Sequence, residues 1–226
     1  MSIDWGPLIL SLKLAATVTL VLIVIGVPLA YSLSRIQGWS RAVIETLITM
    51  SLVLPPTVLG FYMLVLLSPN SWLGATLERM FGIQLLFSFA GLVVGSVIFS
   101  LPFMVGPLLN GLEGIPESLV EASYTLGRSK LYTLFRVQLP TIRASVLTAL
   151  VLTFAHTIGE FGVVLMIGGN IPGKTRVASI AIYSELDALN YRGAEEYALI
   201  LLLFSFVVIL IVRLVGRGRN ARMNAI

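Results

Sequence analysis

The sequence contains no cysteine and a single histidine, His156. Without cysteine the chain has no disulfide framework, no thiolate metal site and no cysteine nucleophile. Charge is scarce as well: 12% of the residues are charged, where a soluble domain carries about 25%. Apolar residues make up 57% of the chain. Because a soluble domain must cover its outside with polar side chains, this composition excludes an ordinary water-soluble enzyme and predicts a surface that faces lipid.

The charges that are present do not form a nucleic-acid footprint. The chain has 15 Lys and Arg residues against 11 Asp and Glu residues, a net charge of +4. The basic residues are spread along the chain instead of forming one patch or stripe. We therefore expect no nucleic-acid partner.

Five stretches are long, apolar and almost free of charge, as transmembrane helices of about 20 residues require. They predict spans at about 10–33, 44–67, 90–112, 144–167 and 197–215. Pro55 and Pro56 should kink or break the second span, and Pro102 and Pro107 should bend the third. The predicted fold class is an all-α membrane protein, with residues 1–226 as one transmembrane domain.

Basic residues indicate the orientation of these spans, because Lys and Arg concentrate in cytoplasmic loops. Ten of the 15 follow spans one, three and five: Arg35, Arg41, Arg128, Lys130, Arg136, Arg143, Arg213, Arg217, Arg219 and Arg222. The opposite side is net negative. The pattern predicts an outside N terminus and a cytoplasmic C terminus. Segment 113–140 is then a cytoplasmic loop, and segment 168–196 an outer loop with a short interfacial helix.

The cytoplasmic segment 113–140 contains a predicted helix. Pro116 and Glu117 suit the first turn of a helix, and Gly127 should end it. A module with so little bulk cannot bury a core alone, so it should dock on another surface. A polar linker between two spans is an equally good interpretation of these physical features.

A resemblance to a known family favours docking. Glu121, Ala122 and Ser123, then Gly127, then Val137-Gln138-Leu139-Pro140 resemble the signature loop of ABC importer permeases, with Ser123 in place of a usual Ala. In such permeases this loop forms the coupling helix, which sits in a groove of the ATPase. The resemblance implies that Glu121, Ala122, Ser123 and Gly127 carry the coupling.

Further stretches resemble the oxyanion branch of these permeases, and most closely the molybdate permeases. They are Leu54 to Gly60, Gly159 to Gly162, Gly169 to Arg176, and Ala181 to Tyr183. The resemblance implies a type I importer fold in a prokaryotic inner membrane and a pathway made by two copies. It also implies two separate ATPase subunits that hold ATP and Mg, and an extracytoplasmic protein that delivers molybdate or tungstate. A sulfate or thiosulfate permease stays open as an alternative. An ion-coupled secondary transporter is a more distant one, because no inverted repeat is evident.

Gly168 to Thr175 fits the phosphate-loop pattern G-x-x-x-x-G-K-T. That loop needs a preceding strand and free backbone N–H groups, whereas this segment leaves a span, and Pro172 has no N–H. We therefore expect the chain to bind no nucleotide, to hold no cofactor of its own and to have no catalytic site.

His156 and Glu160 are the ionisable groups of the fourth span, and they lie four residues apart on one helix face. Two ligands do not make a metal site, so neither a metal nor an intramembrane enzyme is expected. We assign Glu160, His156 and Arg176 to the outer gate or the pathway, with Glu160 paired to Arg176 or Lys174. The pathway itself should offer weak, neutral donors. Most span hydroxyls, among them Ser96, Ser100, Thr153 and Thr157, should bond to their own helices.

Overall fold

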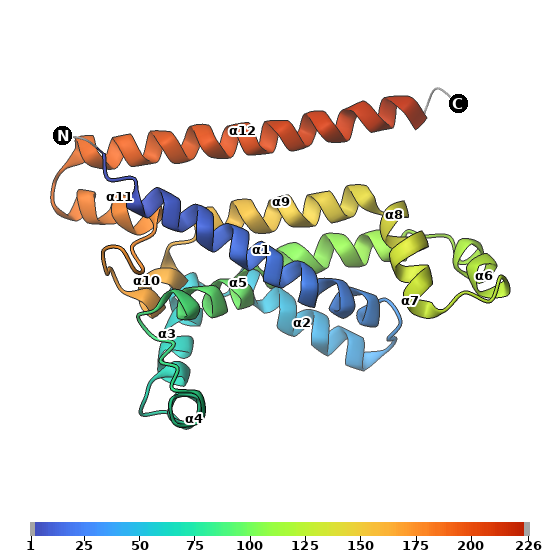
Figure 1. The fold of residues 1–226 in the computed structure, drawn as a ribbon, viewed down its shortest axis with the longest axis horizontal. Coiled ribbons are helices and arrows are strands. Elements are labelled where there is room, and N and C mark those ends of the chain that lie inside the picture. The colour runs from blue at the N-terminus through green and yellow to red at the C-terminus, as the bar shows by residue number, and fades with distance from the viewer. Residues whose placement is uncertain (1–2, 224–226) are drawn as a thin grey trace.

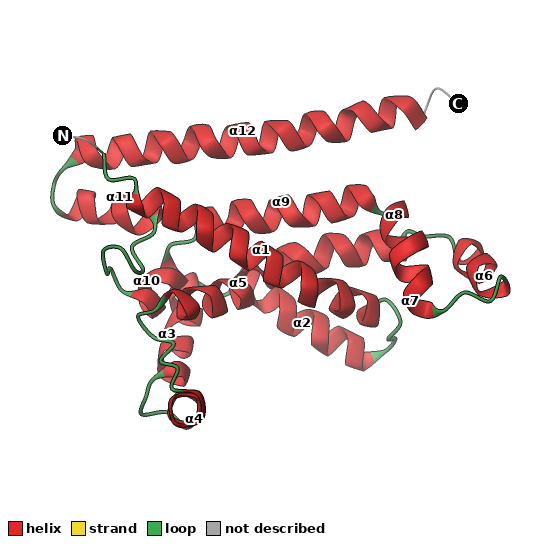
Figure 2. Cartoon of the chain, viewed as in Figure 1, coloured by secondary structure: helices red, strands yellow, loops and turns green. Residues whose placement is uncertain are grey.

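A computed structural model describes residues 3–223 of the chain, and the side chains of all these except residues 81 and 211–223. In this range the regular structure is entirely helical (Figure 2). The elements are α1 (Gly6–Leu33), α2 (Trp39–Val53), α3 (Pro56–Leu67), α4 (Trp72–Phe81), α5 (Phe89–Glu113), α6 (Glu117–Thr125), α7 (Lys130–Thr133), the π-helical turn η1 (Leu134–Gln138), α8 (Leu139–Thr141), α9 (Arg143–Gly159), α10 (Gly162–Gly168), α11 (Ala178–Asp187) and α12 (Tyr191–Met223).

Three helices, α1, α5 and α9, pack side by side and form the core (Figure 1). Small residues let them approach closely: Ala15 and Ala30 of α1 and Ala149 of α9 are fully buried. Leucine, valine and methionine side chains fill the space between them, including Leu14, Val18, Leu22, Met104 and Leu108. Close packing of small residues is the usual way in which helices associate within a membrane, because apolar area alone gives them no advantage over lipid.

The helices agree with those of a membrane protein and allow three to five crossings. α1, α5 and α12 are each long and apolar enough to span a membrane. Two bent pairs bring the number to as many as five, if each pair makes one crossing. The break predicted at Pro55 and Pro56 is confirmed, since the chain bends there by 111° between α2 and α3. Pro102 and Pro107 both lie inside α5, which continues through them as one helix.

The stretch predicted as the fourth span is divided in two. α9 ends at Gly159, Glu160 has an extended backbone with φ −66° and ψ 131°, and α10 begins at Gly162. The Ser179 hydroxyl, from α11, donates to the Glu160 carbonyl over 2.6 Å and replaces a lost helical hydrogen bond. A contact from a distant element therefore stabilises this break, which explains why hydropathy did not reveal it.

The two ends of the helical bundle carry different elements. α6 and α7 lie at one end, and α10, α11 and the start of α12 at the other (Figure 1). The N-terminal segment belongs to the second end, where the Tyr197 hydroxyl donates to the Asp4 carbonyl over 2.8 Å. α11 is a short helix within the segment predicted to hold one. The arginines after the fifth predicted span, from Arg213 onward, lie outside the residues whose side chains are described.

α12 runs along the bundle and contacts α11 and α9 (Figure 1). Much of its described surface is apolar and exposed, including Leu199, Leu202, Leu203, Phe206 and Leu210. Such a face suits lipid or another hydrophobic surface, because contiguous exposed apolar side chains are unfavourable in water.

Candidate functional site

Residues 114–140, which we call the end module, form the first of two candidate regions. α6 starts after Pro116, whose backbone is extended, and Glu117 occupies its first turn. It ends where Gly127 adopts a φ of +72°, in the left-handed region that favours glycine. There the Gly127 N–H donates to the Tyr124 carbonyl over 2.8 Å. The predicted beginning and end of this helix are confirmed.

Ser123 faces the inside of the end module. Its hydroxyl lies 2.9 Å from that of Thr133, and both side chains are buried. The Thr133 hydroxyl donates to the Ser129 carbonyl over 3.0 Å, so Ser123 is the donor to Thr133. This hydrogen bond fastens α6 to α7. Sequence reasoning treated Ser123 only as a small residue and missed the role of its hydroxyl, although an isolated departure from Ala was the available clue.

The outer surface of the end module is partly apolar. Of the signature residues, Glu121, Ala122 and Gly127 are exposed. Large apolar side chains are exposed with them: Leu119, Leu126, Leu131, Tyr132 and Phe135, with Leu126 at 77%. A module with a hydrogen-bonded pair of hydroxyls inside and large apolar side chains outside has the character of a docking surface.

Polar contacts connect the end module to the ends of the long helices. Arg35, just after α1, donates from Nη2 to the Tyr124 hydroxyl over 3.3 Å. Arg41 of α2 forms an ion pair with Glu113 at the end of α5, and a second with Glu45 at 2.6 Å. The Arg35 hydrogen bond connects α6 to the end of α1, and the Arg41 ion pair connects α2 to α5 beside it.

The second region, which we call the junction, is where the chain breaks at 54–55 and 160–161 meet. α3 and α10 pack closely because glycines face the contact. A Cβ on Gly162 would lie 2.8 Å from the Pro56 Cβ and 3.3 Å from the Thr57 nitrogen. A Cβ on Gly60 would lie 2.9 Å from the Met166 Cβ. Neither position has room for a side chain without movement of its neighbours.

His156 is held on one wall of the junction by aromatic rings and a hydroxyl. Its ring stacks on Phe103 with centroids 4.1 Å apart and lies 4.8 Å from the centroid of Phe99. Its Nδ1 lies 2.9 Å from the Ser100 hydroxyl, which in turn lies 3.1 Å from the Thr157 hydroxyl. These contacts join α9 to α5. The expectation that span hydroxyls bond to their own helices is correct for Thr157, which donates to the Thr153 carbonyl, but misses the role of Ser100 between helices.

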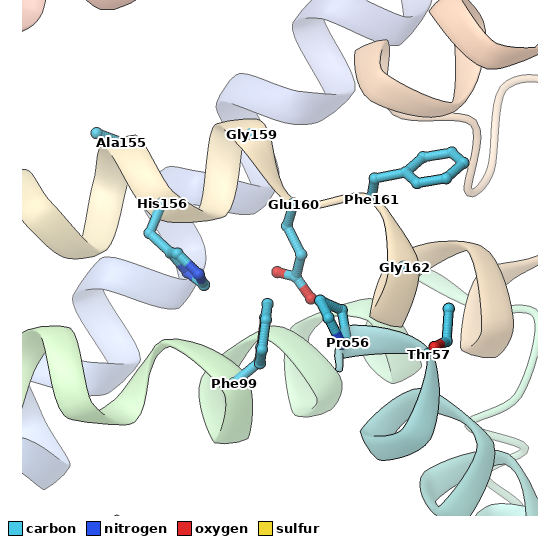
Figure 3. A pocket seen from close by; sticks show the side chains of 9 residues that line it. All are labelled: Pro56, Thr57, Phe99, Ala155, His156, Gly159, Glu160, Phe161 and Gly162. Carbon is cyan, nitrogen blue, oxygen red and sulfur yellow. The ribbon is translucent and has the colours of Figure 1, made fainter. Parts of the chain in front are cut away.

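Glu160 lies at the break and is almost completely buried, with 3% of its surface exposed. Neither carboxyl oxygen has a hydrogen-bond partner among the described residues. The Ser96 hydroxyl comes near the carboxyl without reaching hydrogen-bonding geometry. Figure 3 shows the side chain pointing into the space between His156 and Pro56. This space is an open cavity of about 580 Å³, lined by Pro56, Thr57, Phe99, Ala155, His156, Gly159, Glu160, Phe161 and Gly162.

The expected pairing of Glu160 with Arg176 or Lys174 is wrong for the described structure. Arg176 donates from Nε to the Asn170 side-chain carbonyl over 2.6 Å, and Asn170 donates to the Ser184 hydroxyl. Arg176 is thus held by Asn170 and is not among the residues that line the cavity. Glu160 and His156 therefore share a site that does not include Arg176.

Several backbone donors in and next to the glycine-rich segment 168–175 are occupied. The N–H groups of Lys174, Thr175 and Arg176 all point to the Ile171 carbonyl, at 3.2, 3.0 and 3.1 Å. The Thr175 hydroxyl donates to the Gly168 carbonyl over 2.7 Å and accepts from the Ile171 N–H. The segment follows α10 instead of a strand, so it lacks the context of a phosphate loop. Across residues 3–223, no group of three or more His, Cys, Asp or Glu side chains is placed to hold a metal.

These features agree with the family to which the sequence belongs. Residues 22–223 match the family described as "Binding-protein-dependent transport system inner membrane component". The chain belongs to this family and is therefore a transport subunit of the inner membrane, of the class of ABC importer permeases, which act with ATPase and binding-protein partners.

Individual relatives of the chain are permeases of molybdenum and sulfate transport systems. The chain is 45% identical to the molybdenum transport system permease protein ModB of Azotobacter vinelandii, over 91% of each chain. It is 32% identical to ModB of Escherichia coli K12, over 97% of this chain and 96% of that one. A probable sulfate transport system permease protein, cysT of Chlorella vulgaris, is 31% identical over 90% of this chain and 76% of the relative.

Solved structures share the fold. A chain of the inward-facing MetNI methionine ABC transporter matches with a TM-score of 0.69 and 16% identity, over 94% of both chains. A chain of a bacterial ABC transporter that imports the acidic polysaccharide alginate matches with a TM-score of 0.71 and 17% identity, over 93% of this chain and 79% of that one. The type I importer permease fold expected from the signature loop is confirmed.

Proposed function

We propose that the chain is the permease subunit of an ATP-driven importer that moves molybdate across the inner membrane. The observation that carries this proposal is its 45% identity, over 91% of each chain, to a molybdenum transport permease. Tungstate, with the same charge and tetrahedral shape, is expected to share the route. Sulfate is the second candidate, because a sulfate permease is 31% identical.

Five crossings, counting each bent pair as one, form half of the pathway. The N terminus is then outside and the end module cytoplasmic. Two copies are needed, because one small bundle with broken helices cannot enclose an aqueous route and two gates. Two ATPase subunits bind ATP and Mg on the cytoplasmic side, and a molybdate-binding protein docks on the outer side. The permease itself catalyses no reaction.

The end module is the element that couples ATP to transport. Glu121, Ala122 and Gly127 lie on the exposed surface that enters a groove of the ATPase, and Ser123 holds α6 in the shape that fits it. Closure of the ATPase pair moves the two modules together. Since α6 is bonded to Arg35 and to α7, this displacement reaches α1 and α9 and opens the outer side.

The junction belongs to the gate and pathway. Broken backbone at membrane depth is tolerated only where it is buried in protein or lines a water-filled cavity. Glu160 and His156 lie at such a break. Arg176 has a different part, because it orders the outer loop through Asn170.

ATP hydrolysis by the reconstituted complex tests the proposal. We expect the binding protein loaded with molybdate or tungstate to stimulate ATP hydrolysis. The same binding protein incubated with sulfate should not stimulate it. Equal stimulation by sulfate would remove the substrate assignment and leave the importer class intact. Molybdate uptake by the purified permease alone, driven by an ion gradient, would instead support a secondary transporter.

A further inference from the structure

The cavity at the junction has hydrogen-bond donors on one wall. The first N–H groups of a helix have no partner inside that helix. In α3 the N–H groups of Val58 and Leu59 turn back to the Pro55 carbonyl, and Pro56 has none. The N–H and hydroxyl of Thr57 are therefore the donors that the N-terminal end of α3 presents to the cavity.

Gly162 lies next to this end of α3. A Cβ at Gly162 would lie 2.8 Å from the Pro56 Cβ and 3.3 Å from the Thr57 nitrogen, so a larger residue there would crowd the donors. Broken helices in transporters place their half-helix N-termini at anionic substrates in this way.

Glu160 supplies the second, independent observation. Its carboxyl is almost fully buried, has no hydrogen-bond partner among the described residues and points into the same cavity (Figure 3). An unpaired charge in such a place is very costly, and a buried carboxyl avoids the cost by keeping its proton. A neutral carboxylic acid is a hydrogen-bond donor and can serve a bound anion.

His156 packs against Phe99 and Phe103, and this apolar setting disfavours a positive charge on its ring. Thr157 donates to the Thr153 carbonyl, so Ser100 must donate to Thr157 and accept from Nδ1–H of His156. In the neutral ring, Nε2 then carries a lone pair and does not donate. The cavity thus combines donors with no Lys or Arg, a combination that allows an anion to bind and to leave.

We propose that this cavity is an oxyanion subsite within the permease. Thr57, through its N–H and hydroxyl, and Glu160, as a neutral acid, donate hydrogen bonds to a tetrahedral oxyanion on its way through the membrane. The inference rests on the proposed function and extends it, because it places a weak binding site in the permease in addition to the one in the delivering protein.

Equilibrium binding of radioactive molybdate to the permease–ATPase complex, without binding protein or nucleotide, tests the subsite. We expect saturable binding by the unaltered complex. Glu160→Ala and Thr57→Val should each weaken it about tenfold, since each removes a hydrogen bond to a charged ligand. Glu160→Gln, whose amide still donates, should bind within about threefold of the unaltered complex, and Thr57→Ser should bind normally. The exposed Glu195→Gln is the matched control for loss of a carboxyl.

Two results would overturn the subsite. One is the absence of saturable binding by the unaltered complex. The other is tighter binding by both Glu160→Gln and Glu160→Ala, which would mean that Glu160 is ionised and repels the anion. Co-purification of each variant with the ATPase shows that it has folded. Stimulation of ATP hydrolysis by the loaded binding protein, measured on the same preparation, distinguishes the importer function from the subsite. If hydrolysis is still stimulated but the complex itself binds no molybdate, only the subsite is refuted.

Discussion

The end module and the junction are both built from short helices bounded by proline and glycine, but their buried hydroxyl and carboxyl groups differ. In the end module the buried Ser123 and Thr133 hydroxyls pair with each other and apolar side chains face outward, although the buried Gln138 side-chain oxygen has no partner among the described residues. In the junction apolar helices pack tightly, and the buried Glu160 carboxyl has no partner in the described part of the chain. A region whose short helices are fastened together by an internal hydrogen bond can move as a unit against another protein. A region with an unsatisfied carboxyl inside is suited to a ligand or to a change of conformation.

The largest loss of stability should come from filling the tight contact of the junction. Gly162→Ala places a Cβ 2.8 Å from that of Pro56, and overpacking of this kind costs about 2 kcal/mol. Gly159→Ala is the matched control, because a Cβ there meets nothing within 4 Å. The midpoint of thermal unfolding in detergent should fall for the first variant only. Equal midpoints would show that the junction is looser than its geometry implies.

The second-largest effect should come from a change in the left-handed turn of the end module at Gly127. Gly127→Val forces a β-branched residue to φ +72° and costs roughly 1–2 kcal/mol, whereas Gly127→Asn is tolerated better. We expect Gly127→Val to abolish molybdate transport while the dimer persists. Gly173→Val carries similar strain, at φ +73° with no neighbour within 4 Å, in the segment between α10 and α11. If both Val variants transported equally well per ATP hydrolysed, the turn at Gly127 would not serve coupling.

A smaller effect should separate the two members of the hydroxyl pair. Thr133→Val leaves the buried Ser123 hydroxyl without a partner and should cost about 1–2 kcal/mol. Ser123→Ala should cost less, because Thr133 still donates to the Ser129 carbonyl. Thermal unfolding of both single variants and the double variant gives the coupling energy. Thr125→Ala, at an exposed hydroxyl, is the control. If it lowered stability as much as Thr133→Val does, the pairing of Ser123 with Thr133 would not be what stabilises the end module.

The smallest effect should come from the ion pairs beside the end module. Arg41 and its partners Glu45 and Glu113 are partly exposed, so solvent and salt weaken their attraction. Arg41→Gln should lower the unfolding midpoint slightly in low salt and not at all in high salt. Arg192→Gln, at a more exposed pair, should have no effect in either buffer. A large loss that persists in high salt would mean that Arg41 matters through packing.

Local features of the sequence were sufficient for much of the fold. Pro55 and Pro56 lack backbone donors and predicted the break before α3 correctly, and Pro116 and Gly127 predicted the limits of α6. The break at Glu160 was not predictable in this way. It depends on Ser179, nineteen residues further along the chain, and on the approach of Gly162 to Pro56.

The candidate site was predicted only in part. Glu160 and His156 were identified correctly as neighbours, because ionisable residues in an apolar span are conspicuous. Their partners were not: Arg176 bonds to Asn170, and His156 bonds to Ser100 of another helix. Thr57 lies in the stretch Leu54 to Gly60 that resembles the molybdate permeases, but its donors were not singled out, since a hydroxyl in a span usually bonds to its own helix.

By itself the sequence determined that this protein lies in a membrane, where its long apolar stretches run and which short segment resembles a coupling loop. Hydropathy, proline and glycine act within a few residues of themselves, so these properties can be read locally. Only the tertiary structure decided which buried polar groups are paired and which are not, because a hydrogen bond depends on the position of groups that the fold brings together from distant parts of the chain.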